Sequence, residues 1–420
     1  MDSLIFAEIS CMKRLLVIGY VWPEPGSSAA GSRMMFLLNS FKNRDYKICF
    51  ATTASRTAYM ADLESLGITT KSIRLNDSSF DRFLSDFKPD VVLFDRFMME
   101  EQFGWRVDDF APKAIKVLDT EDLHFLRKAR EEAWKKKLPE TSLILDSDLT
   151  KREIASIYRC DLSLIISDFE MDLLKNQFNI PFSILFYFPF LVPEIKETED
   201  LPKFKERGHF LTIGNFKHEP NRNSVLYLKE MIWPLIRKEL PKAELHIYGA
   251  YESAKIKALH HPASGFQIKG RAADSREVMK NARICIAPLR FGAGIKGKFI
   301  EAMQCGTPSV TTPVGTEGIA SSREWPGMVK TEPEAIAKAA VDLYLNEKNW
   351  QMAHKKGVEI INERFTDKGI SGNFFEILES VKAKLQSHRR ENFTGAMLKH
   401  HQHRSTYFMA KFIEEKNRDK

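Results

Sequence analysis

The stretch APLRFGAGIKGKFIEAMQCGTPSVTTPVGTEGI, residues 287–319, contains a strand end, a glycine-rich loop, a helix and the next strand. The helix is predicted from about Lys296 to Gln304, because Gly306 is a good C-terminal cap and Pro308 cannot continue a helix. The run SVTT at 309–312 follows as a strand. Strands joined through a helix are typical of a parallel sheet, so this unit predicts an α/β fold.

The same alternation extends in both directions from this unit. Continuous apolar runs, typical of strands buried on both faces, occur at 14–20, 46–53, 70–75, 90–95 and 114–119, and again at 210–214, 244–249, 266–270 and 284–289. Helices are predicted between them at 32–41, 59–66, 223–238 and 275–281. The predicted fold class is α/β, with two doubly wound, Rossmann-like parallel-sheet domains that face a central cleft.

A Lys-, Glu- and Pro-rich stretch at 192–208 predicts a linker between an N-terminal domain at 12–191 and a C-terminal domain at 209–380. The remaining residues, 381–420, form a basic tail that is helical in part. We expect it to cross back to the N-terminal domain and to dock through an apolar face, which consists of Tyr407, Phe408, Phe412 and Ile413. Contact with an anionic membrane surface is the alternative.

Composition excludes several classes of protein. The 420 residues are 43% hydrophobic and 28% charged, as in globular proteins, and no apolar run is long enough for a transmembrane helix. Asp2 disfavours a signal peptide, and five cysteines without a CxxC pair disfavour a disulfide framework, so a cytoplasmic location is expected. Most of the net charge of +7 lies in the tail, and the nearly neutral body argues against a nucleic-acid partner.

The loop and helix of residues 287–319 fit a diphosphate. Gly292 and Gly294 let the backbone approach an anion, and Lys296 and Lys298 add positive charge at the helix N-terminus. Glu301, one turn later, can accept hydrogen bonds from two adjacent ribose hydroxyls. The alternative is an amphipathic helix with a Lys–Glu surface pair.

Three segments together carry a family resemblance: FLTIGNFKHEPNRNSVLYLKEMIWPLIRKELPKAELHIYGA (210–250), IKGRAADSREVMKNARICIAPL (268–289) and residues 287–319. Over most of 209–320 the chain resembles the donor domain of retaining GT-B glycosyltransferases of family four. The resemblance implies a GT-B fold, a nucleotide-sugar donor bound by the second domain, an acceptor facing the first domain, and no metal or other cofactor.

The resemblance also implies roles for individual positions. Glu301 matches the glutamate that holds the ribose, and the nucleobase is expected at Gly270 and Arg271. The donor diphosphate is expected at Gly214, Asn215, Gly292, Gly294, Lys296 and Lys298, and the cleft is lined by Thr316 and Glu317. An earlier glutamate that often touches the transferred sugar is absent, because Ala293 occupies its position.

Residues 23–34, PEPGSSAAGSRM, separate the first strand from the first helix. Their GxxxxG spacing resembles a phosphate loop, but Ser32 stands where that motif needs lysine, so a P-loop ATPase is disfavoured. The family resemblance implies instead a cleft loop that includes Gly31 and Arg33, with Arg33 at the helix start able to reach a phosphate. The alternative is a capped helix start without a ligand.

The segment KVLDTEDLHFLRKAR, 116–130, ends a strand at the expected cleft. Relatives often have a His–Asp pair here, and Glu121 and Asp122 occupy the aligned positions, with His124 as an alternative histidine. These three residues are the predicted catalytic set. The alternative interpretation is that the acidic residues of this segment only stabilise the N-terminus of the following helix through its dipole.

The run SLILDSD, 142–148, resembles the Asp-x-Asp metal site of a different glycosyltransferase fold. However, Thr150 and Glu153 have the spacing of a capping box, so Asp146 and Asp148 are interpreted as residues before a helix. No metal site is predicted.

The predicted function is transfer of a sugar from a nucleotide-sugar donor to a glycan, lipid-linked or small-molecule acceptor, with retention at the anomeric carbon. A nucleotide-sugar-binding protein without transfer activity is one alternative, which Ala293 and Glu121 motivate. A GT-B sugar epimerase is another. The expected location is cytoplasmic, with membrane association as an alternative.

Overall fold

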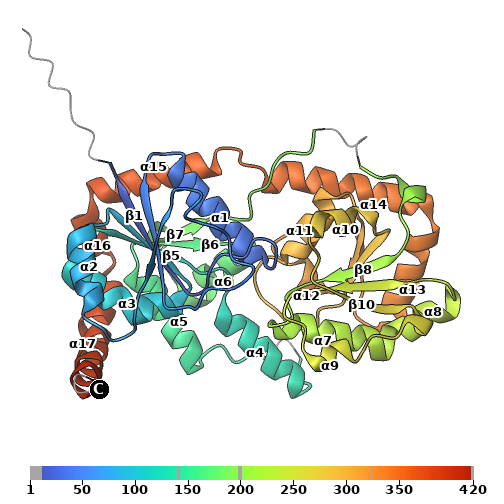
Figure 1. Cartoon of the computed structure of the whole chain (residues 1–420), viewed down its shortest axis with the longest axis horizontal. Helices are drawn as coiled ribbons and strands as arrows, with labels where there is room; N and C mark the ends of the chain where they lie inside the picture. The colour runs from blue at the N-terminus through green and yellow to red at the C-terminus, as the bar shows by residue number, and fades with distance from the viewer. Residues whose placement is uncertain (1–11, 140–141, 197–200, 322, 418–420) are drawn as a thin grey trace, which may run out of the picture.

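The computed structural model describes residues 12–139, 142–196, 201–321 and 323–417. These residues form two domains, each built on a parallel sheet between helices (Figure 1). The predicted α/β fold class with two doubly wound domains is confirmed. Cys11, residues 197–200 of the predicted linker and residues 418–420 of the predicted tail lie outside the described residues.

The first sheet has seven parallel strands in the order β3-β2-β1-β4-β5-β6-β7. They are β1 (Arg14–Gly19), β2 (Lys47–Thr52), β3 (Thr69–Ser72), β4 (Val91–Asp95), β5 (Ile115–Asp119), β6 (Leu162–Ile165) and β7 (Leu185–Tyr187). The intervening helices are α1 (Ala29–Lys42), α2 (Ser79–Phe87), α3 (Phe97–Phe110), α4 (His124–Lys135), α5 (Asp148–Arg159) and α6 (Asp168–Phe178).

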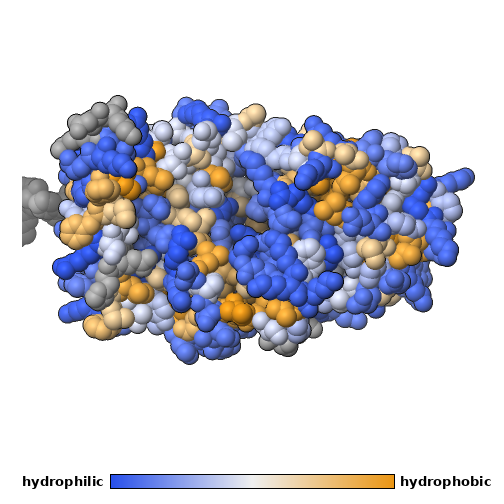
Figure 2. All heavy atoms as spheres, turned by 90° about the horizontal axis from the view of Figure 1, so that it is seen from below, coloured by the Kyte–Doolittle hydropathy of each residue, from blue (hydrophilic) through white to orange (hydrophobic). Residues whose placement is uncertain are grey.

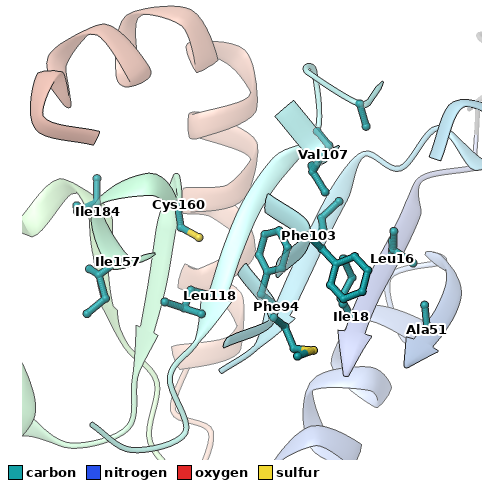
Figure 3. Packing of buried hydrophobic residues seen from close by; sticks show 14 of the residues in the cluster. Leu16, Ile18, Ala51, Phe94, Phe103, Val107, Leu118, Ile157, Cys160 and Ile184 are labelled. Atoms are coloured by element: carbon teal, nitrogen blue, oxygen red, sulfur yellow. The ribbon is translucent and has the colours of Figure 1, made fainter. Parts of the chain in front are cut away.

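Successive residues of β1 point to opposite faces of this sheet. Leu15 and Val17 join the apolar cluster that packs under α1, whereas Leu16 and Ile18 join the cluster that includes Phe103 of α3 (Figure 3). Both faces are therefore covered. This explains why the strands read as continuous apolar runs in the sequence.

The second sheet has six parallel strands in the order β10-β9-β8-β11-β12-β13. They are β8 (Phe210–Ile213), β9 (Leu245–Tyr248), β10 (Phe266–Gly270), β11 (Ile284–Ala287), β12 (Ser309–Thr311) and β13 (Gly327–Val329). Helices follow as α7 (Glu219–Tyr227), α8 (Trp233–Glu239), α9 (Ala254–Lys257), α10 (Ser275–Asn281), α11 (Gly297–Gln304), α12 (Pro313–Thr316), α13 (Pro333–Leu345) and α14 (Glu347–Ile360). In both sheets the strand order reverses beside the domain's first strand, where open parallel sheets bind ligands.

The chain returns to the first domain after α14. The amide of Val192 donates to the carbonyl of Phe365 at 2.7 Å, so the outgoing and returning segments lie side by side. Helix α15 (Ile370–Ala383) then packs Phe374 and Leu378 into the first-domain core. The predicted end of the second domain at residue 380 is therefore wrong, because α15 packs with the first domain.

Helices α16 (Leu385–Glu391) and α17 (Phe393–Lys416) continue over the first domain. Glu414 of α17 pairs with buried Arg106 of α3 at 2.6 Å, and Tyr407 lies 5.2 Å, ring to ring, from Trp105. Phe408 and Phe412 are 66% and 65% exposed, so the predicted docking face is wrong for these two residues.

On the face shown in Figure 2 the surface is mostly hydrophilic, with separate hydrophobic patches. Among the described residues, no helix is both long and apolar enough to span a bilayer.

Several local predictions are wrong because tertiary contacts replace the expected pattern. No helix forms at 59–66, where the backbone makes turns and the Ala61 amide donates to the Pro23 carbonyl at 2.8 Å. Helix α1 begins at Ala29 rather than Ser32, because the Ser28 hydroxyl accepts from the Gly31 amide. The predicted helix at 223–238 begins earlier, as α7, and includes a π-helical turn before α8.

The run at 142–148 forms no strand, and Asp148 is the first residue of α5 rather than a residue before it. Helix α5 is capped by Ser147, whose hydroxyl accepts from the Thr150 amide at 3.2 Å, so the predicted Thr150–Glu153 capping box is wrong. The carboxylate of Glu153 instead accepts from the amides of His124 and Phe125 at the start of α4.

A buried ion pair fastens α1 to β5. The Arg33 guanidinium is 2% exposed and reaches the Asp119 carboxylate with Nε and Nη2 at 2.9–3.2 Å. Its Nη1 donates to the Phe188 carbonyl at 2.6 Å. The predicted role of Arg33 as a phosphate contact is therefore wrong, because its guanidinium is committed inside the first domain.

Replacing Arg33 with alanine leaves Asp119 buried without its cation. We expect R33A to lower the free energy of unfolding of the first domain by about 3–5 kcal/mol, the usual effect of breaking a buried pair. Arg56→Ala is the matched control, because Arg56 and Glu64 form an ion pair that is more than half exposed, and we expect about 1 kcal/mol or less. Urea unfolding followed by tryptophan fluorescence measures both, and equal losses would contradict the assignment.

Candidate active site

The glycine-rich loop between β11 and α11 packs against the first domain. Gly294 has φ of +63°, a conformation that favours glycine, and a Cβ there would lie 2.7 Å from the Cβ of Asp122. The Gly294 amide donates to Oε1 of Glu170 at 2.9 Å, and Arg130 donates to the Gly292 carbonyl at 2.9 Å. The predicted diphosphate loop therefore lies at the interface between the domains.

The two predicted phosphate lysines flank the start of α11. Lys296 is buried, donates to the Gly294 carbonyl at 2.9 Å and lies 3.6 Å from the Glu317 carboxylate. Lys298 donates to Oδ1 of Asn221 at 2.8 Å. Burial lowers the pKa of Lys296, and it lowers the pKa of Lys298 to about 8. A buried ammonium group gains from a nearby anion, which is the environment that a diphosphate would supply.

Asn221 connects Lys298 with the loop after β8 and was not predicted. Its Nδ2 donates to the Asn215 carbonyl at 2.9 Å, while its Oδ1 accepts from Lys298. A Cβ at Gly214 would lie 2.7 Å from the Asn221 side chain. Gly214, Asn215 and Lys298 are thus brought together around one amide. The only sequence signal for Asn221 is its position near the start of a helix that follows the predicted diphosphate residues Gly214 and Asn215.

The predicted ribose residue Glu301 lies on α11 and faces α10. Its carboxylate accepts a hydrogen bond from the hydroxyl of Ser275, the first residue of α10, and burial raises its pKa. Ser275 was not predicted as a partner. The Glu301 carboxylate already has the kind of contact, a hydroxyl donor, that a ribose would offer.

The predicted nucleobase loop after β10 reaches the first domain. Gly270 has φ of +73°, and the neighbouring Arg271 guanidinium lies 4.5 Å above the Tyr59 ring. The hydroxyl of Tyr251, in the loop after β9, donates to Glu24 of the first domain at 2.6 Å. Both contacts join the two domains on this side of their interface. Neither contact corresponds to a motif in the sequence.

On the first-domain side, the predicted catalytic residues follow β5. Glu121 is buried with φ of +62°, and burial, together with the neighbouring Asp119, raises its pKa well above the ordinary value. Burial acts to raise the pKa of Asp122, but the ion pair with Arg127, together with His124 and Arg96, outweighs this effect and lowers the pKa to about 2. The pKa values of these adjacent carboxyl groups are therefore shifted in opposite directions.

His124 begins α4 beside these carboxyl groups. Its Nε2 lies 3.4 Å from Oδ1 of Asp122 but makes no hydrogen bond within the described part of the chain. Burial lowers the pKa of His124 to about 3, against the opposing effect of Asp122. A neutral imidazole at this position can donate to or accept from a ligand hydroxyl.

Two further residues close to Asp122 were not predicted from the sequence. Arg96 follows β4 with φ of +70°, and its charge lies within reach of Asp95, Glu121 and Asp122. His218, after β8 of the second domain, has its pKa lowered to about 4 by burial and by Arg127. Unpatterned loop residues such as these leave no signal in one sequence.

The remaining predicted cleft residues have structural contacts. Gly31 lies inside α1, where a Cβ would come within 2.4 Å of the Glu24 backbone. Thr316 ends α12 and donates to the Pro313 carbonyl at 2.8 Å. Glu317 accepts from Arg130 at 2.6 Å and 2.7 Å across the domain interface. Within the described ranges, no group of three or more His, Cys, Asp or Glu side chains could hold a metal ion.

The lowered pKa predicts that the His124 imidazole stays neutral across the physiological range. From the ordinary value of about 6.5 down to about 3, the unfolded chain binds a proton that the folded chain does not, so His124 makes folding less favourable as the pH falls. We expect its ¹⁵N side-chain resonances, assigned with H124Q, to remain unchanged from about pH 8 to pH 5. A titration midpoint near 6.5 would contradict this environment.

Comparisons with known proteins bear on this arrangement. The family model Glycosyl transferases group 1 matches residues 207–346, whereas a sequence search of curated proteins finds no match. The fold is similar to sucrose-phosphate synthase from Thermosynechococcus elongatus (TM-score 0.65, 14% identity, covering 89% of this chain and 100% of that chain). It is also similar to a TarM mutant from S. aureus in a complex with UDP (TM-score 0.66, 11% identity, covering 87% of this chain and 100% of that chain). A third similar structure is Anabaena HepE in complex with UDP and glucose (TM-score 0.63, 14% identity, covering 87% of this chain and 99% of that chain).

At these identities the solved structures establish the fold, and the family model carries the activity class. Residues 207–346 of the second domain match the group 1 glycosyl transferase model, and the chain is a glycosyltransferase with the GT-B fold of these solved structures.

Proposed function

We propose that this protein transfers a sugar from a nucleoside diphosphate donor to an acceptor at the domain interface, with retention at the anomeric carbon. The observation that carries this proposal is the site at α11, where a glycine-rich loop, buried Lys296 and half-buried Lys298 precede the Glu301 carboxylate. UDP is the first nucleotide to test, because the TarM and HepE structures were solved with UDP.

In this proposal, catalysis depends on positioning and electrostatics. Lys296 and Lys298 would stabilise the negative charge that develops on the leaving diphosphate, and Asn221 would orient Lys298. Glu301 would hold the ribose hydroxyls. The carboxyl group of Glu121 and the neutral imidazole of His124 would hydrogen-bond the sugar or the acceptor from the first-domain side. No metal or other cofactor is part of the proposal.

A nucleotide-sugar-binding protein without transfer activity is the second candidate, because Ala293 replaces a glutamate that relatives often have. Ala293 packs against the apolar cluster of the first domain that includes Leu123 and Phe125. A carboxylate there would lie against these apolar side chains, so packing favours the alanine. Binding of nucleotide sugar without turnover, whatever acceptor is supplied, would favour this second candidate.

Glu301→Ala should weaken nucleotide binding. The loss of charge-assisted hydrogen bonds to two ribose hydroxyls, at about 1.5–3 kcal/mol each before compensation, predicts a rise in the UDP dissociation constant of tenfold or more. Calorimetry with UDP, GDP and ADP measures the effect and identifies the preferred base. Exposed Glu277 of the neighbouring helix α10 provides the control variant E277A, for which we expect unchanged affinity. Unchanged affinity in folded E301A would reject the ribose assignment.

We also propose that α17 contacts an anionic membrane surface, which suits a lipid-linked acceptor and a cytoplasmic, membrane-associated enzyme. The exposed large apolar side chains of this helix include Phe393, Met397, Phe408, Met409 and Phe412. Basic residues accompany them on the same helix, including exposed Arg404 and Lys416. Apolar and basic side chains on one helix are typical of interfacial binding.

Removing two of these rings should release the protein from vesicles. We expect the double variant F408S/F412S to lose most of its co-sedimentation with vesicles that contain phosphatidylserine. Phe182→Ser is the control, because Phe182 is 70% exposed but lies outside α17. Equal sedimentation of both variants and the unaltered protein would contradict membrane contact through α17, as would equal binding to neutral vesicles.

A further inference from the structure

Two first-domain side chains hold the backbone of the donor loop from opposite sides. Oε1 of Glu170, on α6, accepts from the Gly294 amide at 2.9 Å, and Nη1 of Arg130, on α4, donates to the Gly292 carbonyl at 2.9 Å. Both side chains are buried, at 0% and 5% exposure. The loop itself belongs to the second domain, so these two hydrogen bonds exist only while the domains are in contact.

We propose that Glu170, assisted by Arg130, is a positioning residue that sets the donor-diphosphate loop into its binding conformation only when the two domains close. The inference rests on the proposed nucleotide-sugar function for its meaning. The interdomain hydrogen bond on which it depends can be tested without any nucleotide.

One oxygen atom of Glu170 connects the two halves of the site. Oε1 accepts from the Leu123 amide at 3.0 Å as well as from the Gly294 amide. Leu123 directly follows Glu121 and Asp122, so the same atom holds the turn that faces the sugar and the loop that faces the diphosphate. The Ser167 hydroxyl donates to Oε2 at 3.2 Å and orients the carboxylate. A single acceptor atom thereby joins the two halves.

The position of Lys296 also depends on first-domain contacts. Lys296 donates to the Gly294 carbonyl and lies 3.6 Å from Glu317. Glu317 is held in turn by Arg130, at 2.6 Å and 2.7 Å. When the domains separate, Lys296 loses the fixed backbone and the fixed carboxylate that orient it. The ammonium group that would meet the diphosphate is thus oriented through α4 and α6.

Packing around the loop shows that it fits closely against the first domain. A Cβ at Gly294 would meet Asp122 at 2.7 Å, and a Cβ at Gly318 would meet Ser167 at 2.5 Å. Ala293 packs on the first-domain apolar cluster. Closing the domains excludes water from this side of the loop, and hydrolysis of a bound donor is then disfavoured.

Glu153 provides a matched control for Glu170. It is equally buried, and it also accepts two backbone amides, those of His124 at 3.1 Å and Phe125 at 2.8 Å. Both of its bonds stay inside the first domain. A purely structural role at the start of α4 would therefore be lost equally in E153A and E170A, whereas the interdomain role would be lost only in E170A.

The experiment measures amide hydrogen exchange of the peptide that contains Gly292–Gly294 in the ligand-free full chain. We expect exchange at least about tenfold faster in Glu170→Ala, equivalent to about 1.4 kcal/mol, and little change in E153A. Glu170→Gln should behave as the unaltered protein, because an amide oxygen can still accept both backbone bonds. Glu170→Asp, which keeps the charge but shortens the reach, replaces E170A if that variant does not fold.

A second measurement connects the loop with the donor. We expect the donor KM to rise about tenfold in E170A and to be restored in E170Q. Equal exchange in E170A and the unaltered protein, or equal acceleration in E153A, would overturn the positioning role. If no nucleotide binds to the unaltered protein, the proposed function fails, but the exchange measurement still decides whether Glu170 holds the loop.

Discussion

The carboxylates buried at the carboxyl end of the first sheet impose the constraint on which the rest of the structure depends. A buried carboxylate is costly unless cations or hydrogen-bond donors surround it. Asp119 obtains the Arg33 guanidinium, and this pairing fastens α1 to β5. Glu153 and Glu170 obtain the backbone amides at the start of α4. The loop that carries Glu121 and Asp122 is thus fixed by acids on α5 and α6.

The same requirement extends across the domain interface. Glu170 takes one of its amides from Gly294 of the second domain, and Glu317 of the second domain takes its guanidinium from Arg130 of the first. Each domain therefore supplies hydrogen-bond donors to a carboxyl group of the other. The donor loop lies between these two exchanges, and at Gly294 the Asp122 side chain leaves no space for a Cβ.

The sequence predicted regular elements well where a local pattern determines them. The apolar runs of β1, β4 and β5 are buried on both faces, and α10 coincides with the predicted 275–281 because Asp274 caps it and Asn281 ends it. Prediction from the sequence failed where a contact with a distant part of the chain replaces the local pattern. The amphipathic stretch at 59–66 is held in turns through Pro23, and Glu153, spaced for a cap of its own helix, caps α4 instead.

The sequence by itself determined the two α/β domains, the glycine loop with Lys296 and Lys298, and the placing of Glu301 one turn later, because strand burial, glycine content and helical spacing are properties of neighbouring residues. The tertiary structure alone decided that Arg33 pairs with Asp119, that Asn221 orients Lys298, and that Glu170 and Arg130 hold the donor loop. Glu170 and Gly294 are 124 positions apart, and no local periodicity records such a pairing. Their contact exists because folding brings the carboxyl ends of two sheets together and leaves a buried acid that needs a donor.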